Sequence, residues 1–186
     1  MAKIDWVNFG GHRQRCVNLT ASVGKGGRNL WRDVMLIQAL FAYLHNSRHA
    51  AALHLPKNFF QSLGTALGAG NMNVATLHTI RDFQTINRKH LLSADGNIEP
   101  AKYAGRVIEG NPMTQPLMTI TYLHVLAKRV ESSAETKMID KAAHSGRDSI
   151  TGKVSGAVIG GTIALLTAGV DYIDKLNRIA PDLHLH

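Results

Sequence analysis

The chain has 186 residues, of which 45% are hydrophobic and 18% charged, a balance typical of a globular protein that buries a core. Its 21 Lys and Arg against 13 Asp and Glu give a formal charge of +8, which favours anionic partners such as a wall polymer, acidic lipid or nucleic acid. The single cysteine, Cys16, excludes an internal disulfide and argues against a zinc site built from several cysteines.

Residues 1–21 mix aromatic and basic side chains around a Gly10-Gly11 pair, which predicts an extended or hairpin-like lead-in. Alternation over residues 17–22 indicates a short strand. The first residues place Asp5 and Asn8 where a secretory signal would be apolar, so we expect no signal peptide and a cytoplasmic location before any export.

A glycine-rich loop follows at residues 23–29, with Lys25 between glycines. A phosphate-binding loop would need Ser or Thr directly after the lysine, whereas Gly26 stands there, so we predict a tight turn with Asn29 as a helix N-cap. The next apolar residues recur at helical spacing and predict the first helix: Trp31, Val34, Ile37, Leu40, Phe41 and Leu44.

The middle of the chain predicts two more helices and a turn. A short helix is expected over residues 57–67, closed by glycines at 68 and 70. Asn73 is the expected N-cap of a longer helix whose apolar stripe is Val74, Leu77, Ile80 and Phe83 or Gln84, with Arg81 and Asp82 facing solvent. Asp95-Gly96 predicts a turn with a positive-φ glycine, and Pro100 prevents a helix from continuing through it.

These motifs share an order along the chain with a known family. Val23-Gly24, Asp33-Val34-x-x-Ile37-Gln38-x-Leu40, Thr79-Ile80-Arg81-x-Phe83-Gln84 and Asp95-Gly96-x-Ile98-x-Pro100 resemble the signature of small helical peptidoglycan-binding domains. In that family two helices carry the glutamines and an Asp-Gly turn closes the unit. The likeness spans residues 22–108 and is similar to variants found in Gram-negative proteins, some of them near contact-dependent secretion systems. Ala101-Lys102 departs from the glycine pair usual there.

The resemblance implies a mainly α fold. It places a small helical peptidoglycan-binding-like bundle at residues 22–130, after the lead-in of residues 1–21 and before a C-terminal helical extension over residues 131–186. Gln38 and Gln84 are expected to act as structural hydrogen-bonding groups or to face a shallow groove.

A ligand made of sugars and peptide stems needs directional donors and a carboxylate clamp. The expected ligand-binding residues are Arg81, Gln84, Asn87, Arg88, Asp95 and Asn97. Ordinary solvated surface is the rival explanation for these side chains.

Metal binding is not predicted, although the chain has 10 histidines. His45 and His49 lie four residues apart but lack the H-E-x-x-H pattern of a zinc enzyme. The pair His184 and His186 is expected in a mobile tail, and the isolated histidines at the surface or at helix ends: His78, His90, His124 and His144.

No catalytic motif or cofactor site is recognised. Cys16 lies near His12 but without an Asn or Asp partner that would complete a nucleophile. The acidic residues that could serve glycoside hydrolysis are better explained by helix faces and turns: Asp82, Asp95, Glu99 and Glu109.

Beyond residue 110, Leu117, Ile120, Leu123 and Leu126 or Ala127 predict a further amphipathic helix ending at Lys128-Arg129. Residues 131–152 are polar and read as a connector or exposed helix. Residues 154–173 are apolar, with Gly156-x-x-x-Gly160 spacing. This run is either a close-packed helix or a segment that inserts into a membrane.

The expected function is non-enzymatic recognition or targeting of peptidoglycan, with an exported interbacterial effector or its accessory as one setting. Such a protein would meet the periplasm or a target-cell envelope, an export machinery and an inhibitor protein. Three alternatives stay open: a membrane-active, pore-forming toxin using residues 154–173, an unrecognised peptidoglycan hydrolase and, last, a nucleic-acid binder.

Overall fold

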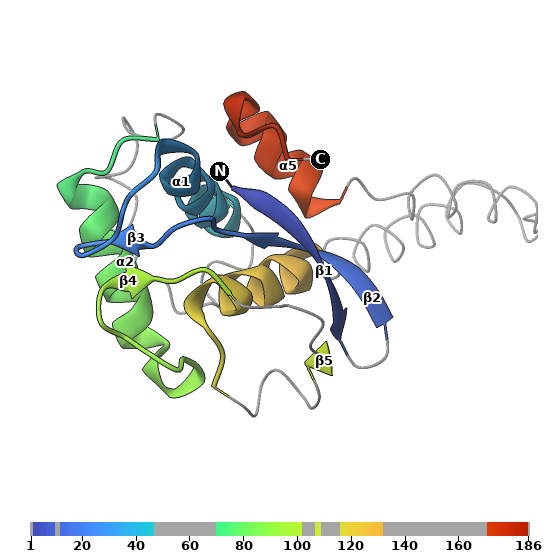
Figure 1. The fold of residues 1–186 in the computed structure, drawn as a ribbon, viewed down its shortest axis with the longest axis horizontal. Helices are drawn as coiled ribbons and strands as arrows, with labels where there is room; N and C mark the ends of the chain where they lie inside the picture. Colours follow the sequence, from blue (N-terminus) through green and yellow to red (C-terminus); the bar gives the residue numbers. More distant parts are fainter. Residues whose placement is uncertain are drawn as a thin grey trace, which may run out of the picture.

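The computed structural model describes residues 2–9, 12–46, 70–101, 107–108, 116–131 and 171–185 (Figure 1). Within these ranges the fold is dominated by helices, with two small sheets added to them. The helices are α1 (Trp31–Asn46), α2 (Val74–Ile86), a helix over residues 119–131 and α5 (Tyr172–Ile179), with 3-10 turns η1 (Arg88–His90) and η2 (Pro181–Leu183). The strands are β1 (Lys3–Phe9), β2 (His12–Asn18), β3 (Val23–Gly24), β4 (Asn97–Ile98) and β5 (Val107–Ile108).

The N-terminal lead-in is a β-hairpin, as its sequence predicted. β1 and β2 pair antiparallel from Lys3↔Asn18 to Phe9↔His12, and β5 adds a short parallel strand to β1. The strand expected at residues 17–22 instead ends at Asn18. There the side chain of Asn18 bonds the backbone N–H and C=O of Ala101, so the chain turns toward that residue.

The second sheet joins two loops that are far apart in sequence. β3 and β4 pair antiparallel, with Val23 opposite Ile98 and Gly24 opposite Asn97. Asn29 does not cap α1, contrary to the sequence prediction, because its φ is 51° and its amide is bonded to the glycine loop. Its Oδ1 accepts from the Gly24 N–H, and its Nδ2 donates to the carbonyls of Gly24 and Gly27.

Side chains at the N-terminal ends of α1 and α2 hydrogen-bond nearby backbone groups. Asn73 caps α2 as predicted, with its Oδ1 accepting from the Thr76 N–H at 2.7 Å. The buried Asp33 in the first turn of α1 accepts from the N–H groups of Thr20 and Ala21, which ties this helix to the end of the hairpin. The prediction for Val74 was wrong, because it lies in the first turn of α2 and is 67% exposed.

One core holds the described segments together. The ring of Phe83 on α2 lies 5.5 Å from that of Phe41 on α1 and 6.1 Å from that of Tyr122 on the helix over residues 119–131. α5 adds its buried side chains at the other side of α1, where Figure 1 shows it next to the hairpin. The core therefore draws on the hairpin as well as on all four helices.

The C-terminal residues are packed, which corrects the expectation of a mobile tail. Leu183 and Leu185 are buried, and the side chain of Asn177 bonds both the N–H and the C=O of Leu185. His184 lies between them and is exposed. The segment is thus part of the core up to residue 185.

Several sequence predictions lie outside the described residues: the helix at 57–67, the connector after residue 131, His49, His144 and His186, and the run 154–173 up to residue 170. The end of that run is described, and it begins a separate helix, because Asp171 is the N-cap of α5. No helix in the described ranges has the length and apolar character needed to cross a membrane.

Candidate functional site

Two glutamines on successive helices hold two turns in the same way. On α1, Gln38 donates its Nε2 to the carbonyl of Asn71 at 3.1 Å and accepts at Oε1 from the N–H of Gly70 at 3.3 Å. On α2, Gln84 donates to the carbonyl of Asn97 at 2.7 Å and accepts from the N–H of Gly96 at 2.8 Å. The predicted structural role of both glutamines is confirmed.

We call each arrangement a glutamine clamp, and the two clamps match further. Each Nε2 also donates to a threonine hydroxyl early in the next helix: Gln38 to Thr76 and Gln84 to Thr119, both at 3.1 Å. Gly70 and Gly96 both have positive φ, +66° and +86°. A helix, its clamped glycine turn and the next helix therefore form a unit that occurs twice, which the sequence alone did not reveal.

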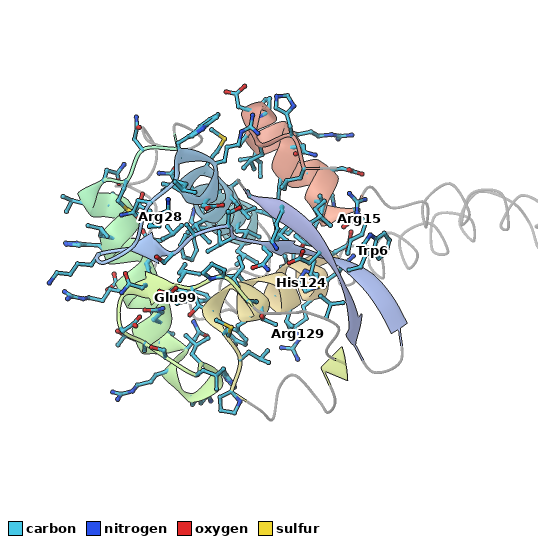
Figure 2. All side chains as sticks on the ribbon, in the orientation of Figure 1. Trp6, Arg15, Arg28, Glu99, His124 and Arg129 are labelled. Atoms are coloured by element: carbon cyan, nitrogen blue, oxygen red, sulfur yellow. The ribbon has the colours of Figure 1, made fainter. Side chains whose placement is uncertain are left out.

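The second clamp supports a surface that we call the loop–turn surface: Lys25, Gly26 and Arg28 of the glycine loop with Asp95, Gly96 and Asn97 of the turn. Asn97 accepts at its Oδ1 from the N–H of Gly26 at 2.9 Å, which joins the two loops. The exposed Asp95 accepts from the N–H of Asn97 and so shapes the turn itself. Figure 2 shows Arg28 at this end of the molecule, with Glu99 nearby.

The predicted ligand residues divide into two groups. Arg81, Arg88 and Asp95 are exposed and Asn97 is half-buried, so these four reach the surface near the second clamp. Gln84 and Asn87 were expected there as well, but they are only 1% and 6% exposed. Gln84 forms the clamp, and Asn87 donates to the carbonyl of Phe83 and accepts from the Tyr122 hydroxyl, so both residues hold the fold.

The loop–turn surface presents charged and polar groups that can form hydrogen bonds with a ligand. Lys25 and Arg28 supply cationic donors from the loop, and Arg81 on α2 and Arg88 on η1 are two further exposed guanidinium groups outside this surface, each within one helical turn of Gln84. Asp95 supplies an acceptor. Among the described residues, no group of three or more His, Cys, Asp or Glu side chains could hold a metal ion.

A second polar cluster is buried beneath the hairpin and was missed by sequence reasoning. The Nε2 of His124 lies 3.2 Å from the Sγ of Cys16, and its Nδ1 lies 2.6 Å from the hydroxyl of Tyr172. His124 was expected to be isolated, and Cys16 was considered with His12. The signal was present in the sequence, since His124 falls on the same helical stripe as Ile120 and Ala127.

Burial controls the protonation of this pair. It raises the pKa of the Cys16 thiol to about 12 and lowers the pKa of the His124 imidazole to about 3, where the charge of Lys128 acts in the same direction. Thiol and imidazole are therefore both neutral at pH 7. A reactive cysteine needs its thiolate and access to substrate, and the fully buried Cys16 has neither.

Charged groups surround the start of α5. Lys128 lies 2.8 Å from Glu131 and 3.4 Å from Asp171, and Arg15 of the hairpin lies 4.0 Å from Asp171. Burial alone would lower the pKa of Lys128, but the bonds and charges of the two acids outweigh it and raise that pKa. Glu131 also accepts the backbone N–H of Tyr172 at 2.8 Å.

Comparison with known proteins found no protein similar to this chain. No protein-family model matches the chain, and no significant match occurs among curated proteins or solved structures.

Proposed function

We propose that this chain is a non-enzymatic peptidoglycan-recognition protein that binds through its loop–turn surface together with Arg81 and Arg88. In this proposal α1, α2 and the helix over residues 119–131 form a helical bundle of the small peptidoglycan-binding type. The protein is exported and meets its ligand in the periplasm or at a target-cell envelope, as an interbacterial effector or an accessory of one.

The glutamine clamps are the observation that carries the proposal. The resemblance selected Gln38, Gln84 and the Asp95-Gly96 turn from their order in the sequence alone. Gln84 holds that same turn from a position 12 residues earlier in the chain. Such agreement between motif and hydrogen bonding supports a domain of this type, because F-Q and D-G dipeptides that occur by chance would not be expected to hydrogen-bond each other.

The ligand class follows from the exposed groups around the second clamp. Peptide stems of a wall polymer carry carboxylates, which guanidinium groups bind with two parallel hydrogen bonds. Arg81 lies one helical turn before Gln84, and Arg88 lies one turn after it. Sugar hydroxyls and amides can use the carboxylate of Asp95 and the cationic donors of the glycine loop.

Cys16 cannot serve as the nucleophile of a hydrolase. The thiol is buried and neutral, and the neighbouring His124 has little tendency to accept a proton. The proposal therefore predicts binding without release of wall fragments.

Co-sedimentation with purified sacculi tests the proposal. The wild-type chain is expected in the pellet, and Arg28→Ala, Arg81→Ala and Arg88→Ala are each expected to weaken binding by about threefold to tenfold, as for loss of one charge-assisted contact. Arg178→Ala is the matched control. It removes one exposed cation from α5, which Figure 1 shows away from α2, β3 and β4.

Three outcomes contradict the proposal. The wild-type chain remains in the supernatant, or Arg178→Ala weakens binding as much as the other variants, which would indicate unspecific charge attraction. Release of soluble muropeptides during the incubation would assign a hydrolytic function instead.

A further inference from the structure

α5 is attached to the rest of the molecule by a polar contact around its first residue. Asp171 caps the helix through the N–H of Ile173 and pairs with Lys128 and Arg15. Tyr172 then enters the core, where its N–H bonds Glu131 and its hydroxyl bonds His124. Apolar contacts of Ile173, Leu176, Leu183 and Leu185 complete the docking.

His124 is the titratable group at the centre of this contact. Both of its ring nitrogens are engaged, one by Cys16 of β2 and the other by Tyr172 of α5, and its side chain is 1% exposed. Its ring also lies 5.5 Å from the ring of Tyr172, in a tilted edge contact. The charged groups that act on it are Lys128 on its own helix and Asp171 at the start of α5. Figure 2 shows His124 on the helix over residues 119–131, below the hairpin in this view.

We propose that residues 171–185 form an acid-released latch. His124 accepts a proton only after Tyr172 and α5 have moved away from it. Docked α5 keeps water from the imidazole, and undocking admits it. Acid therefore favours the undocked state, and the device works independently of any wall binding.

The direction and size of the effect follow from linkage. In the docked state burial holds the pKa of His124 at about 3, and solvent access would return it toward its ordinary value of 6.5. The docked state thus binds fewer protons, so its stability is complete above pH 6.5 and is lost as the pH falls from there toward 3. Between pH 7.5 and 5.5 the undocking equilibrium constant should rise about tenfold.

Native-state hydrogen exchange measures this directly. Opening of residues 171–185 is compared with opening of α1 at pH 7.5 and 5.5 in the intact chain, after correction for the intrinsic pH dependence of exchange. The expected result is a roughly tenfold increase confined to residues 171–185. A change of the same size in α1 would mean global unfolding and would overturn the latch.

Two variants assign the effect to a residue. His124→Gln keeps a neutral donor and acceptor at this position and should abolish the pH dependence. His45→Gln is the matched control, because His45 lies on α1 and also has a pKa lowered by burial, and this variant should keep the tenfold ratio. Retention of the ratio in His124→Gln, or its loss in His45→Gln, would refute the role of His124.

Tyr172→Phe tests the hydroxyl–imidazole bond should His124→Gln fail to fold. It should increase opening of residues 171–185 at both pH values while the tenfold ratio remains, since the ring still covers the imidazole. Unchanged opening in this variant would show that the bond does not hold the latch.

Discussion

The Gln84→Glu substitution tests whether the second clamp depends on a donor as well as an acceptor. The carboxylate has nearly the shape of the amide and can still accept the N–H of Gly96. It cannot donate to the carbonyl of Asn97, now 2.7 Å from Nε2, and it places a charge at a site that is 1% exposed. A lost buried hydrogen bond of ~1–1.5 kcal/mol and an unpaired buried charge together predict a destabilisation of about 3 kcal/mol at pH 7.

The pH dependence makes this prediction specific. Burial raises the pKa of the introduced carboxyl, so the folded state binds more protons and the destabilisation should shrink by about 1–2 kcal/mol between pH 7 and pH 5. Urea unfolding at the two pH values measures it. Gln38→Glu should behave alike, whereas Asn71→Asp, the same exchange at an exposed position, should cost less than about 0.5 kcal/mol. A Gln84→Glu cost within that small range, or one that does not change with pH, would refute the clamp as the stabilising element.

Three further outcomes follow from the same structure. Gly96→Ala should lower the free energy of unfolding in urea by about 1 kcal/mol, because a φ of +86° is strained for alanine although its Cβ would meet no neighbouring atom. Gly24→Ala should lower it by at least about 3 kcal/mol, because its Cβ would clash with the Gly96 carbonyl. Equal costs would contradict this account of the loop. Cys16 should not react with Ellman's reagent at pH 8 until urea is added, and rapid reaction of the native chain would contradict its burial. Asp171→Asn should destabilise by less than about 1 kcal/mol, and high salt should remove the difference by screening the pairs of Asp171 with Lys128 and Arg15. A cost that does not depend on salt would contradict this.

Helix positions were predictable wherever apolar spacing was regular. α1, α2 and the helix over residues 119–131 appear where their stripes predicted them, and Asn73 and Gly96 act as cap and turn residues. These features depend on neighbours within about one helical turn, which a sequence shows directly. The prediction that Val74 belongs to the buried stripe of α2 failed because apolar character in the first turn of a helix does not fix which way the side chain points.

Long-range polar contacts were not predictable from spacing. Cys16 and His124 are 108 residues apart, and His124 and Tyr172 are 48 residues apart. A lone histidine gives no local sign of such partners, apart from its place on a buried stripe. Asn29 shows a different limit, because one short amide can serve a helix cap or a glycine loop, and its bonds to Gly24 and Gly27, all within five residues, use it for the loop.

The site was predictable in part for a related reason. The exposed Arg81, Arg88 and Asp95 were selected from sequence, but so was Gln84, whose neighbouring apolar residues left its orientation open. The turn that it binds fixed that orientation. Motif recognition therefore found the right region before it could separate residues that support the surface from residues that form it.

The clamps grip only main-chain atoms of their turns, and this has a consequence for how such a chain can change. The side chains of Asn71 and Glu99 are exposed and take no part in either clamp of Gln38 or Gln84. Substitutions at these positions, in evolution or by design, can therefore change the exposed surface while the glutamines and glycines keep the framework intact. New ligand specificities can arise from a few such substitutions.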